Sequence, residues 1–125
     1  MKLEFLPAGS VDCPLIRLFW FTQEEASRFA EALRSLAAGA RNSVSVHTEP
    51  GIEIIGHCEL NLRVGDLDRG IIQLGPGTFE CVLTRTGWDN MAGLVEPFCD
   101  AKPTGFQWLI AGGKDNLLLS HDGHW

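Results

Sequence analysis

The sequence predicts an α+β domain of two layers, in which a largely antiparallel sheet of about six to seven strands packs against two helices. Two segments repeat apolar residues at helical spacing, and several shorter segments alternate apolar and polar residues as strands do. Fourteen glycines and six prolines supply turns between them. No repeat or low-complexity linker divides the chain, so residues 1–125 are predicted to form a single domain with the order β-α-β-β-β-β-α-β-β.

The first elements are predicted to be an irregular lead-in and a buried strand. Residues 1–13 mix apolar and polar residues with a proline, which predicts no regular structure. Residues 14–21, PLIRLFWF, are apolar at nearly every position, and Arg17 is their only charge. A strand of that composition is covered on both faces.

The first helix has the clearest boundaries in the sequence. Thr22 and Glu25 have the spacing of a capping box, in which each side chain accepts a hydrogen bond from the other residue's backbone N–H. Gly39 is a natural stop. Between them, apolar residues recur on one helical face at Ala26, Phe29, Ala30, Leu33, Leu36 and Ala37.

The middle of the chain is predicted to form an antiparallel meander. Residues 52–64 alternate so regularly that we expect one long strand, bent at Gly56, with its odd-numbered side chains toward water. After a turn at 65–70, residues 71–74 are expected to pair back as a hairpin, and 79–83 to add a third strand.

The second helix is expected to begin near Thr86 and to end near Pro97, which cannot continue a helix. Two final strands, at 105–111 and 116–120, are expected around the turn sequence GGKDN. The apolar face of the helix consists of Trp88, Met91, Ala92, Val95 and Phe98 or Cys99.

Charge and composition limit the classes of function. Sixteen acidic and ten basic residues give a net charge of −6, and no cluster of lysine and arginine occurs, which argues against nucleic-acid binding. Neither a signal peptide nor an apolar run of about 18 residues is visible, so we expect neither secretion nor a membrane span. The four cysteines have no C-x-x-C spacing, which predicts reduced thiols, no disulfide and a cytoplasmic location.

Four residues are candidates for a metal site. His57 and Glu59 stand at i and i+2 of a predicted strand, so both side chains leave the same face of the sheet. His121 and His124 lie close together near the end of the sequence. These residues define the alternative function, a metal-assisted or acid–base hydrolase.

Structural roles are the preferred explanation for the same residues. The pair Asp122-Gly123 is typical of a tight turn, after which Trp125 would pack back on the sheet. The strand residues would belong to the wet face of a half-solvated sheet. A bound zinc ion needs three or four ligands, and no further ligand is evident, so no cofactor is predicted.

Two further motifs also have structural explanations. Asp66, Asp68 and Gly70 resemble the start of a calcium loop, but glycines occupy the fifth and twelfth positions, so a hairpin turn is expected. Cys58 and Cys81 fall on the apolar phases of their strands, where burial makes a thiol inert.

The start of the second helix is the remaining candidate site. Arg85, Trp88, Asp89 and Asn90 would stand at the helix mouth, where free backbone N–H groups and an arginine bind an anion. The preferred interpretation makes Asp89 an ordinary capping partner of Thr86.

The leading functional hypothesis is a non-catalytic protein-interaction or regulatory module, such as an inhibitor, an immunity-type protein or an adaptor. No set of catalytic residues is evident, so enzyme activity stays an open question. The acidic charge would steer a basic partner. A weak homodimer through an exposed strand at 43–47 is a further expectation. Interface aromatics would come from Phe19, Trp20, Phe21, Trp108 and Trp125, although we expect core packing to account for most of them.

Overall fold

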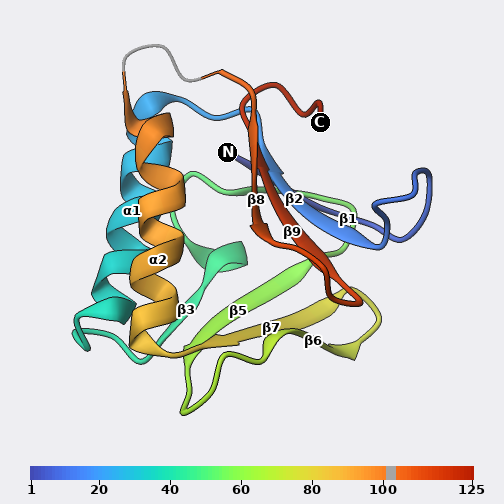
Figure 1. Cartoon of the computed structure of the whole chain (residues 1–125). Coiled ribbons are helices and arrows are strands. Elements are labelled where there is room, and N and C mark those ends of the chain that lie inside the picture. Colours follow the sequence, from blue (N-terminus) through green and yellow to red (C-terminus); the bar gives the residue numbers. More distant parts are fainter. Residues whose placement is uncertain (101–103) are drawn as a thin grey trace.

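The computed structural model describes residues 1–100 and 104–125, which form two sheets and two helices (Figure 1). The five-stranded sheet contains, in spatial order, β4 (Glu53–Ile55), β1 (Lys2–Leu6), β2 (Leu15–Phe19), β9 (Asn116–Ser120) and β8 (Phe106–Ile110). The four-stranded sheet contains, in order, β3 (Ser43–Ser45), β5 (Glu59–Val64), β7 (Thr78–Leu83) and β6 (Gly70–Gly75). The helices are α1 (Gln23–Ala37) and α2 (Arg85–Val95), with 3₁₀ turns η1 (Val46–Thr48) and η2 (Glu96–Cys99).

The predicted α+β class is confirmed, but the predicted sheet is wrong in number and in pairing. The described residues contribute nine strands, and they divide between two sheets. Each sheet mixes parallel and antiparallel neighbours: β2 runs parallel to β9, and β5 runs parallel to β7. The chain enters the four-stranded sheet at β3, returns to the other sheet for β4, and crosses again before β5.

The lead-in that was expected to be irregular forms β1. This strand pairs antiparallel with β2 and parallel with β4. Leu3 is fully buried, whereas Glu4 lies opposite Arg17, with which it forms an ion pair. The prediction was wrong because five residues give too short an alternation to recognise, and the strand is held by its two neighbours rather than by its own pattern.

The long strand expected at 52–64 is two strands in different sheets. The chain leaves the five-stranded sheet after β4, turns at Gly56 with φ of 72°, and begins β5 in the four-stranded sheet. The alternation survives in β5, where Leu60 and Leu62 are fully buried. The predicted bend is therefore a change of sheet, which a period-two pattern cannot reveal.

The predicted meander is also wrong, because β5 pairs with β7 and not with β6. The turn before β6 passes around the end of β7, where the N–H of Gly65 donates to Leu83 O and the N–H of Arg69 donates to Val82 O. Strand β6 then pairs antiparallel with the outer side of β7. This leaves β6 at one edge of the four-stranded sheet.

The first helix is confirmed in detail. Thr22 and Glu25 make the reciprocal capping box, and the predicted apolar stripe supplies the buried residues of α1. The second helix begins at Arg85, next to the predicted Thr86, and the Thr84 side chain caps it by accepting from the N–H of Gly87. Asp68, from the turn that resembled a calcium loop, accepts hydrogen bonds from the Thr84 N–H and hydroxyl and fixes this start.

Both sheets and both helices share one hydrophobic cluster. Figure 1 shows α1 and α2 side by side on one side of the molecule, with the strands of both sheets on the other side. The rings of Phe5 on β1 and Phe79 on β7 join the two sheets, with their centroids 4.7 Å apart. The rings of Phe21 and Phe98 join the segment before α1 to η2. Among the described residues, no helix combines the length and apolar character needed to cross a bilayer.

Candidate functional site

His57 and Glu59 lie at the start of the four-stranded sheet. His57 is exposed in the turn before β5, with its ring close against Gly77. Glu59 points away from the core, as expected for an odd-numbered residue, and its Oε2 accepts a 3.1 Å hydrogen bond from the hydroxyl of Thr78. Its Oε1 lies 3.9 Å from Nε2 of His47, a residue the sequence analysis did not single out.

The two tail histidines follow β9, in the other sheet. The ring of His121 packs edge-on against Phe21, with centroids 5.7 Å apart, and the side chain of His124 is 89% exposed. Across residues 1–100 and 104–125, no three His, Cys, Asp or Glu side chains gather closely enough to hold a metal ion. The hydrolase alternative therefore stays a prediction, with no observation that favours it.

The four candidates at the start of α2 divide between core and surface. Trp88 is fully buried, and its indole N–H donates a 3.1 Å hydrogen bond to Arg63 O on β5, which fixes α2 to the four-stranded sheet. The guanidinium of Arg85 lies on Gly39, where a Cβ atom would come within 2.8 Å of Cζ. Asp89 and Asn90 are exposed. The cap interpretation through Thr86 is wrong, since Thr84 is the capping residue.

The cysteines offer no nucleophile in the core. All four are free, as predicted. Burial, with the nearby charge of Glu59, raises the pKa of Cys58 to about 12, and burial likewise raises the pKa of Cys81 to about 12. Both thiols are therefore protonated at neutral pH and belong to the hydrophobic cluster.

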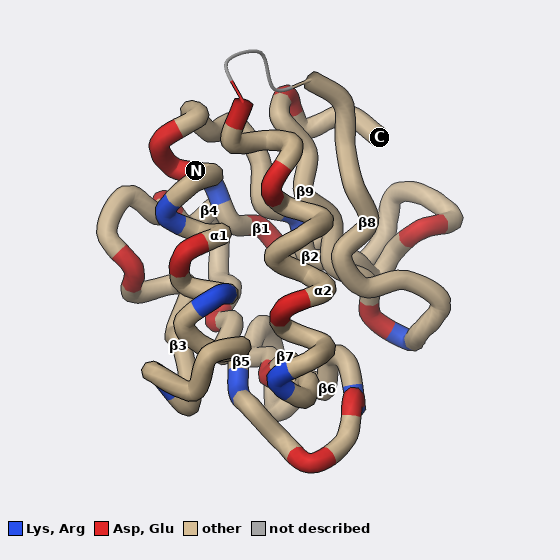
Figure 2. Tube along the Cα trace, turned by 60° about the vertical axis from the view of Figure 1, so that its left-hand side comes forward, with Lys and Arg blue, Asp and Glu red and all other residues tan. Residues whose placement is uncertain are grey.

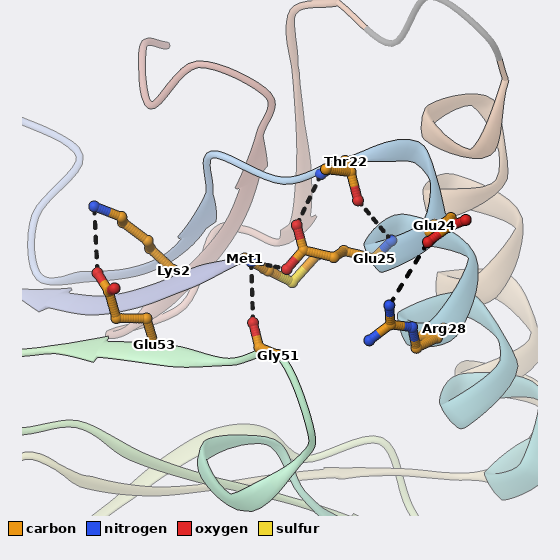
Figure 3. Close-up of polar contacts among 8 residues, drawn as sticks. All are labelled: Met1, Lys2, Thr22, Glu24, Glu25, Arg28, Gly51 and Glu53. Atoms are coloured by element: carbon orange, nitrogen blue, oxygen red, sulfur yellow. Dashed lines mark hydrogen bonds and ion pairs between the residues drawn. The ribbon is translucent and has the colours of Figure 1, made fainter.

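A polar cluster surrounds the amino group of Met1 (Figure 3). The ammonium donates to Glu25 Oε2 and, at 3.2 Å, to Gly51 O, while Glu25 Oε1 accepts from the N–H of Thr22. Burial alone would raise the pKa of Glu25, but the ammonium and Thr22 outweigh it, and the net pKa is lowered. The adjoining cavity of about 60 Å³ is far smaller than a typical ligand site of about 300–1,000 Å³.

The best candidate for a binding surface is the outer face of the five-stranded sheet. Strand register places Phe19 opposite Ser120, and Ser120 opposite Phe106; in the next row Arg17 faces Leu118, which faces Trp108. These side chains point away from the core because Leu18 and Leu119, which alternate with them, belong to the main cluster. We call this surface the aromatic face and define it by Arg17, Phe19, Trp20, Phe106, Trp108 and Trp125.

Cations of the chain already stack on these rings. The guanidinium of Arg17 lies 3.9 Å from the centroid of Phe19 and 5.9 Å from that of Trp125. Nζ of Lys2 lies 4.3 Å from the ring centroid of Trp20. Each cation also has a carboxylate partner: Arg17 binds Glu4 at 2.6 Å, and Lys2 binds Glu53 at 3.3 Å.

The tail lies across the aromatic face and is held by consecutive carbonyl groups. The backbone N–H of Trp20 donates to His121 O, and its indole N–H donates to Asp122 O. Gly123 O accepts from Arg17 Nη1 at 2.9 Å, and His124 O accepts from the hydroxyl of Ser120 at 2.6 Å. The tail sequence that first suggested a metal site is therefore a structural strap.

The aromatic face stays open to solvent despite this strap. Trp20 is 56% exposed, Phe106 is 48% exposed and Trp125 is 37% exposed. A surface hollow of about 320 Å³ lies between the tail and β4, with Lys2, Trp20 and Ile55 among its lining residues.

No family model, curated protein sequence or solved structure matches this chain.

Two carboxylates beside the aromatic face lack a lysine or arginine partner among the described residues. Asp12 accepts from the indole N–H of Trp125 at 3.0 Å. Asp122 accepts from the backbone N–H of His124, and this hydrogen bond lowers the pKa of Asp122. The lowered pKa keeps Asp122 ionised at neutral pH, and Asp12 places a second carboxyl group on the rim of the face.

Only part of this surface was predicted from the sequence. The predicted interface aromatics included Phe19, Trp20, Trp108 and Trp125, but not Phe106, and Arg17 was not predicted to belong to the surface. The spacing of Phe106 and Trp108 contained the signal, because i and i+2 in a strand share a face. Core packing was expected to account for most of the five aromatics considered, but only Phe19 and Phe21 are buried.

Proposed function

We propose that the chain is a non-catalytic protein-interaction module that docks on a basic protein partner through the aromatic face. One observation carries the proposal. Of the four tryptophans, only Trp88 is in the core, while Trp20, Trp108 and Trp125 belong to the outer face of a sheet. Large aromatic side chains that stay exposed to solvent on one face are typical of binding surfaces.

The residue types on this face fit protein recognition. Tryptophan and arginine are enriched among residues that dominate binding energy, because each combines a large contact area with a polar group. Arg17 is held rigidly by Glu4 and by the tail, so it would lose little side-chain freedom when a partner binds.

The charge of the face favours a basic partner. Lys2 and Arg17 are neutralised by carboxylates of the chain, which leaves Asp12 and Asp122 to act on a partner. The net charge of −6 adds long-range attraction for a cationic surface. Figure 2 shows lysine and arginine as separate segments on different elements, which supports a protein rather than a nucleic-acid partner.

Site-specific photocrosslinking tests the docking surface directly. A photoreactive phenylalanine analogue would replace Phe106 in the aromatic face, and a matched variant would carry it at Leu94 on α2, which is 38% exposed. In cells of the source organism, we expect a discrete crosslinked protein from position 106 and not from position 94. Equal crosslinking from both positions would contradict the proposal.

The identified partner then permits a quantitative test. Trp20→Ala and Trp125→Ala are each expected to weaken its binding by about tenfold or more, whereas Leu94→Ala should leave it unchanged. Binding is expected to weaken with added salt, because attraction to a basic surface is screened. If the bound partner loses its own activity, the module is of the inhibitor or immunity type; if the activity persists, it is an adaptor.

A further inference from the structure

Strand β6 presents an open sheet edge without charge. It is six residues long, and β7 is its only strand neighbour in the described chain. The segment 70–79 contains no charged residue; Arg69 precedes it and Glu80 follows it. Leu74, at the irregular end of the strand, is 59% exposed. An uncharged edge strand with exposed apolar residues is a template for pairing with another chain.

The other three sheet edges are less available. Strand β3, the predicted dimer edge, has three residues, and after it Nδ1 of His47 accepts a 3.1 Å hydrogen bond from the N–H of Leu60. The His47 ring therefore takes the place of the next hydrogen bond between β3 and β5, so this edge of the sheet is closed at Leu60. Strand β4 also has three residues and carries Glu53. Strand β8 is shorter than β6, with five residues, and its Phe106 and Trp108 already belong to the aromatic face.

We propose that a second copy of the chain pairs with β6, antiparallel and across a two-fold axis, to join two four-stranded sheets into one. Self-pairing suits this strand because any charge on it would meet an identical charge across the axis, and none is present. Symmetry also restricts the register. Hydrogen-bonded and non-bonded residue pairs alternate along an antiparallel ladder, so neighbouring residues cannot lie opposite each other. The two-fold axis must therefore pass beside a residue that pairs with its own copy, and Ile72 and Gln73 are the central residues of β6.

The same geometry makes the dimer weak. Stable dimers usually bury more than about 1,200 Å². A six-residue strand is only about 20 Å long, so its pairing covers less than that area. Each copy also carries a net charge of −6, which opposes association at low salt. Added salt is therefore expected to strengthen the dimer, opposite to its effect on a basic partner.

Sedimentation velocity over a concentration series tests the proposal. Wild-type chain is expected to shift from monomer to dimer as concentration rises. Gln73→Lys and Gln73→Glu, changes at an exposed residue, should each remain monomeric, and an equimolar mixture of the two should dimerise again. Asn90→Lys, at an exposed amide on α2, is the control and should dimerise like wild type. Circular dichroism would verify that every variant is folded.

Disulfide trapping locates the axis. In a background with Cys13 and Cys99 changed to serine, Ile72→Cys should form a covalent dimer on oxidation if the axis passes beside residue 72, and Gln73→Cys if it passes beside residue 73. The proposal fails if wild type stays monomeric at the highest soluble concentration, or if the Gln73 charges leave a dimer intact. Trp20→Ala should not alter the dimer, so this result is independent of the proposed docking function.

Discussion

The indole N–H of Trp20 donates a 2.8 Å hydrogen bond to the carbonyl of Asp122, across 102 positions of sequence. Trp20 adopts a φ of 49°, a region that non-glycine residues rarely occupy. Its backbone N–H binds His121 O at the same time. One residue at the end of β2 therefore fixes two successive carbonyls of the tail.

Trp20→Phe is expected to loosen the tail without unfolding the chain. The change keeps an aromatic ring but removes the indole donor, so stability should fall by about 1 kcal/mol. Carboxypeptidase should then release the last residues faster than from wild type. Phe106→Leu, on the same face but without a hydrogen bond to the tail, is the control. Equal release from Trp20→Phe and wild type would show that this hydrogen bond does not hold the tail.

The pairing of Arg17 with Glu4 predicts a strongly non-additive mutant cycle. Both side chains are about one-fifth exposed, so Arg17→Met leaves a half-buried carboxylate without its cation and should lower the free energy of unfolding by about 1–3 kcal/mol. The double variant Arg17→Met/Glu4→Gln should recover part of this loss, since no charge is then left unpaired. Urea unfolding of the four proteins measures the coupling, and additive effects would argue against it.

Glu25 predicts a specific loss of stability in acid. Its pKa in the folded protein lies below the ordinary value of 4.5, so the folded state favours the ionised carboxylate. Its contribution is fully present above about pH 4.5 and is lost as pH falls through the lowered folded pKa. In Glu25→Gln, which keeps a capping acceptor, the free energy of unfolding should be lower at pH 6 and change less between pH 5 and pH 3. An unchanged acid slope would contradict this assignment.

Two glycines of α2 should respond oppositely to alanine. At Gly87 an added Cβ would come within 2.6 Å of Asp68 Oδ1 and 3.0 Å of Leu83 Cβ. Gly87→Ala should therefore displace Asp68 from the Thr84 cap and destabilise the protein by about 1–3 kcal/mol. At Gly93 nothing lies within 4 Å, and Gly93→Ala should stabilise it by about 0.5–1 kcal/mol. Thermal unfolding distinguishes the two. Similar effects at both positions would show that Asp68 does not constrain the helix start.

His47 is expected to contribute to stability through its ring acceptor. His47→Ala leaves the N–H of Leu60 without that acceptor, at a cost of about 1–3 kcal/mol. Thr48→Ala removes only an exposed hydroxyl contact with Ser45 O and is the control. Hydrogen exchange should report faster exchange at Leu60 in the first variant alone. Unchanged protection at Leu60 would mean that the ring is not its effective acceptor.

Local signals predicted α1 well, whereas strand pairing was not predictable. The capping box needs only Thr22 and Glu25, three residues apart, so its information is contained in the sequence. Strand β4 separates from β5 because it pairs with β1, where Lys2 lies opposite Glu53. Strand β1 is distant from β4 in the sequence. Such contacts leave no periodic trace in either segment.

The aromatic face was hidden for a similar reason. Residues 14–21 and 105–111 are both rich in large apolar side chains, although burial on both faces was predicted only for the first segment. Phe19 is 4% exposed, whereas Phe106 is 48% exposed. The difference arises because β8 is an edge strand and the tail covers only the region near β2. Sequence order gives no indication of which strand becomes the edge.

The position of β9 between β2 and β8 has a consequence for synthesis on the ribosome. Strand β2 is synthesised long before β9, the neighbour that completes its ladder. Until then, the nascent chain carries a hydrophobic strand with one unsatisfied side, which is a condition that invites chaperone binding. Folding of the five-stranded sheet is therefore expected to wait for β9 and to be rate-limited by contacts between distant parts of the chain.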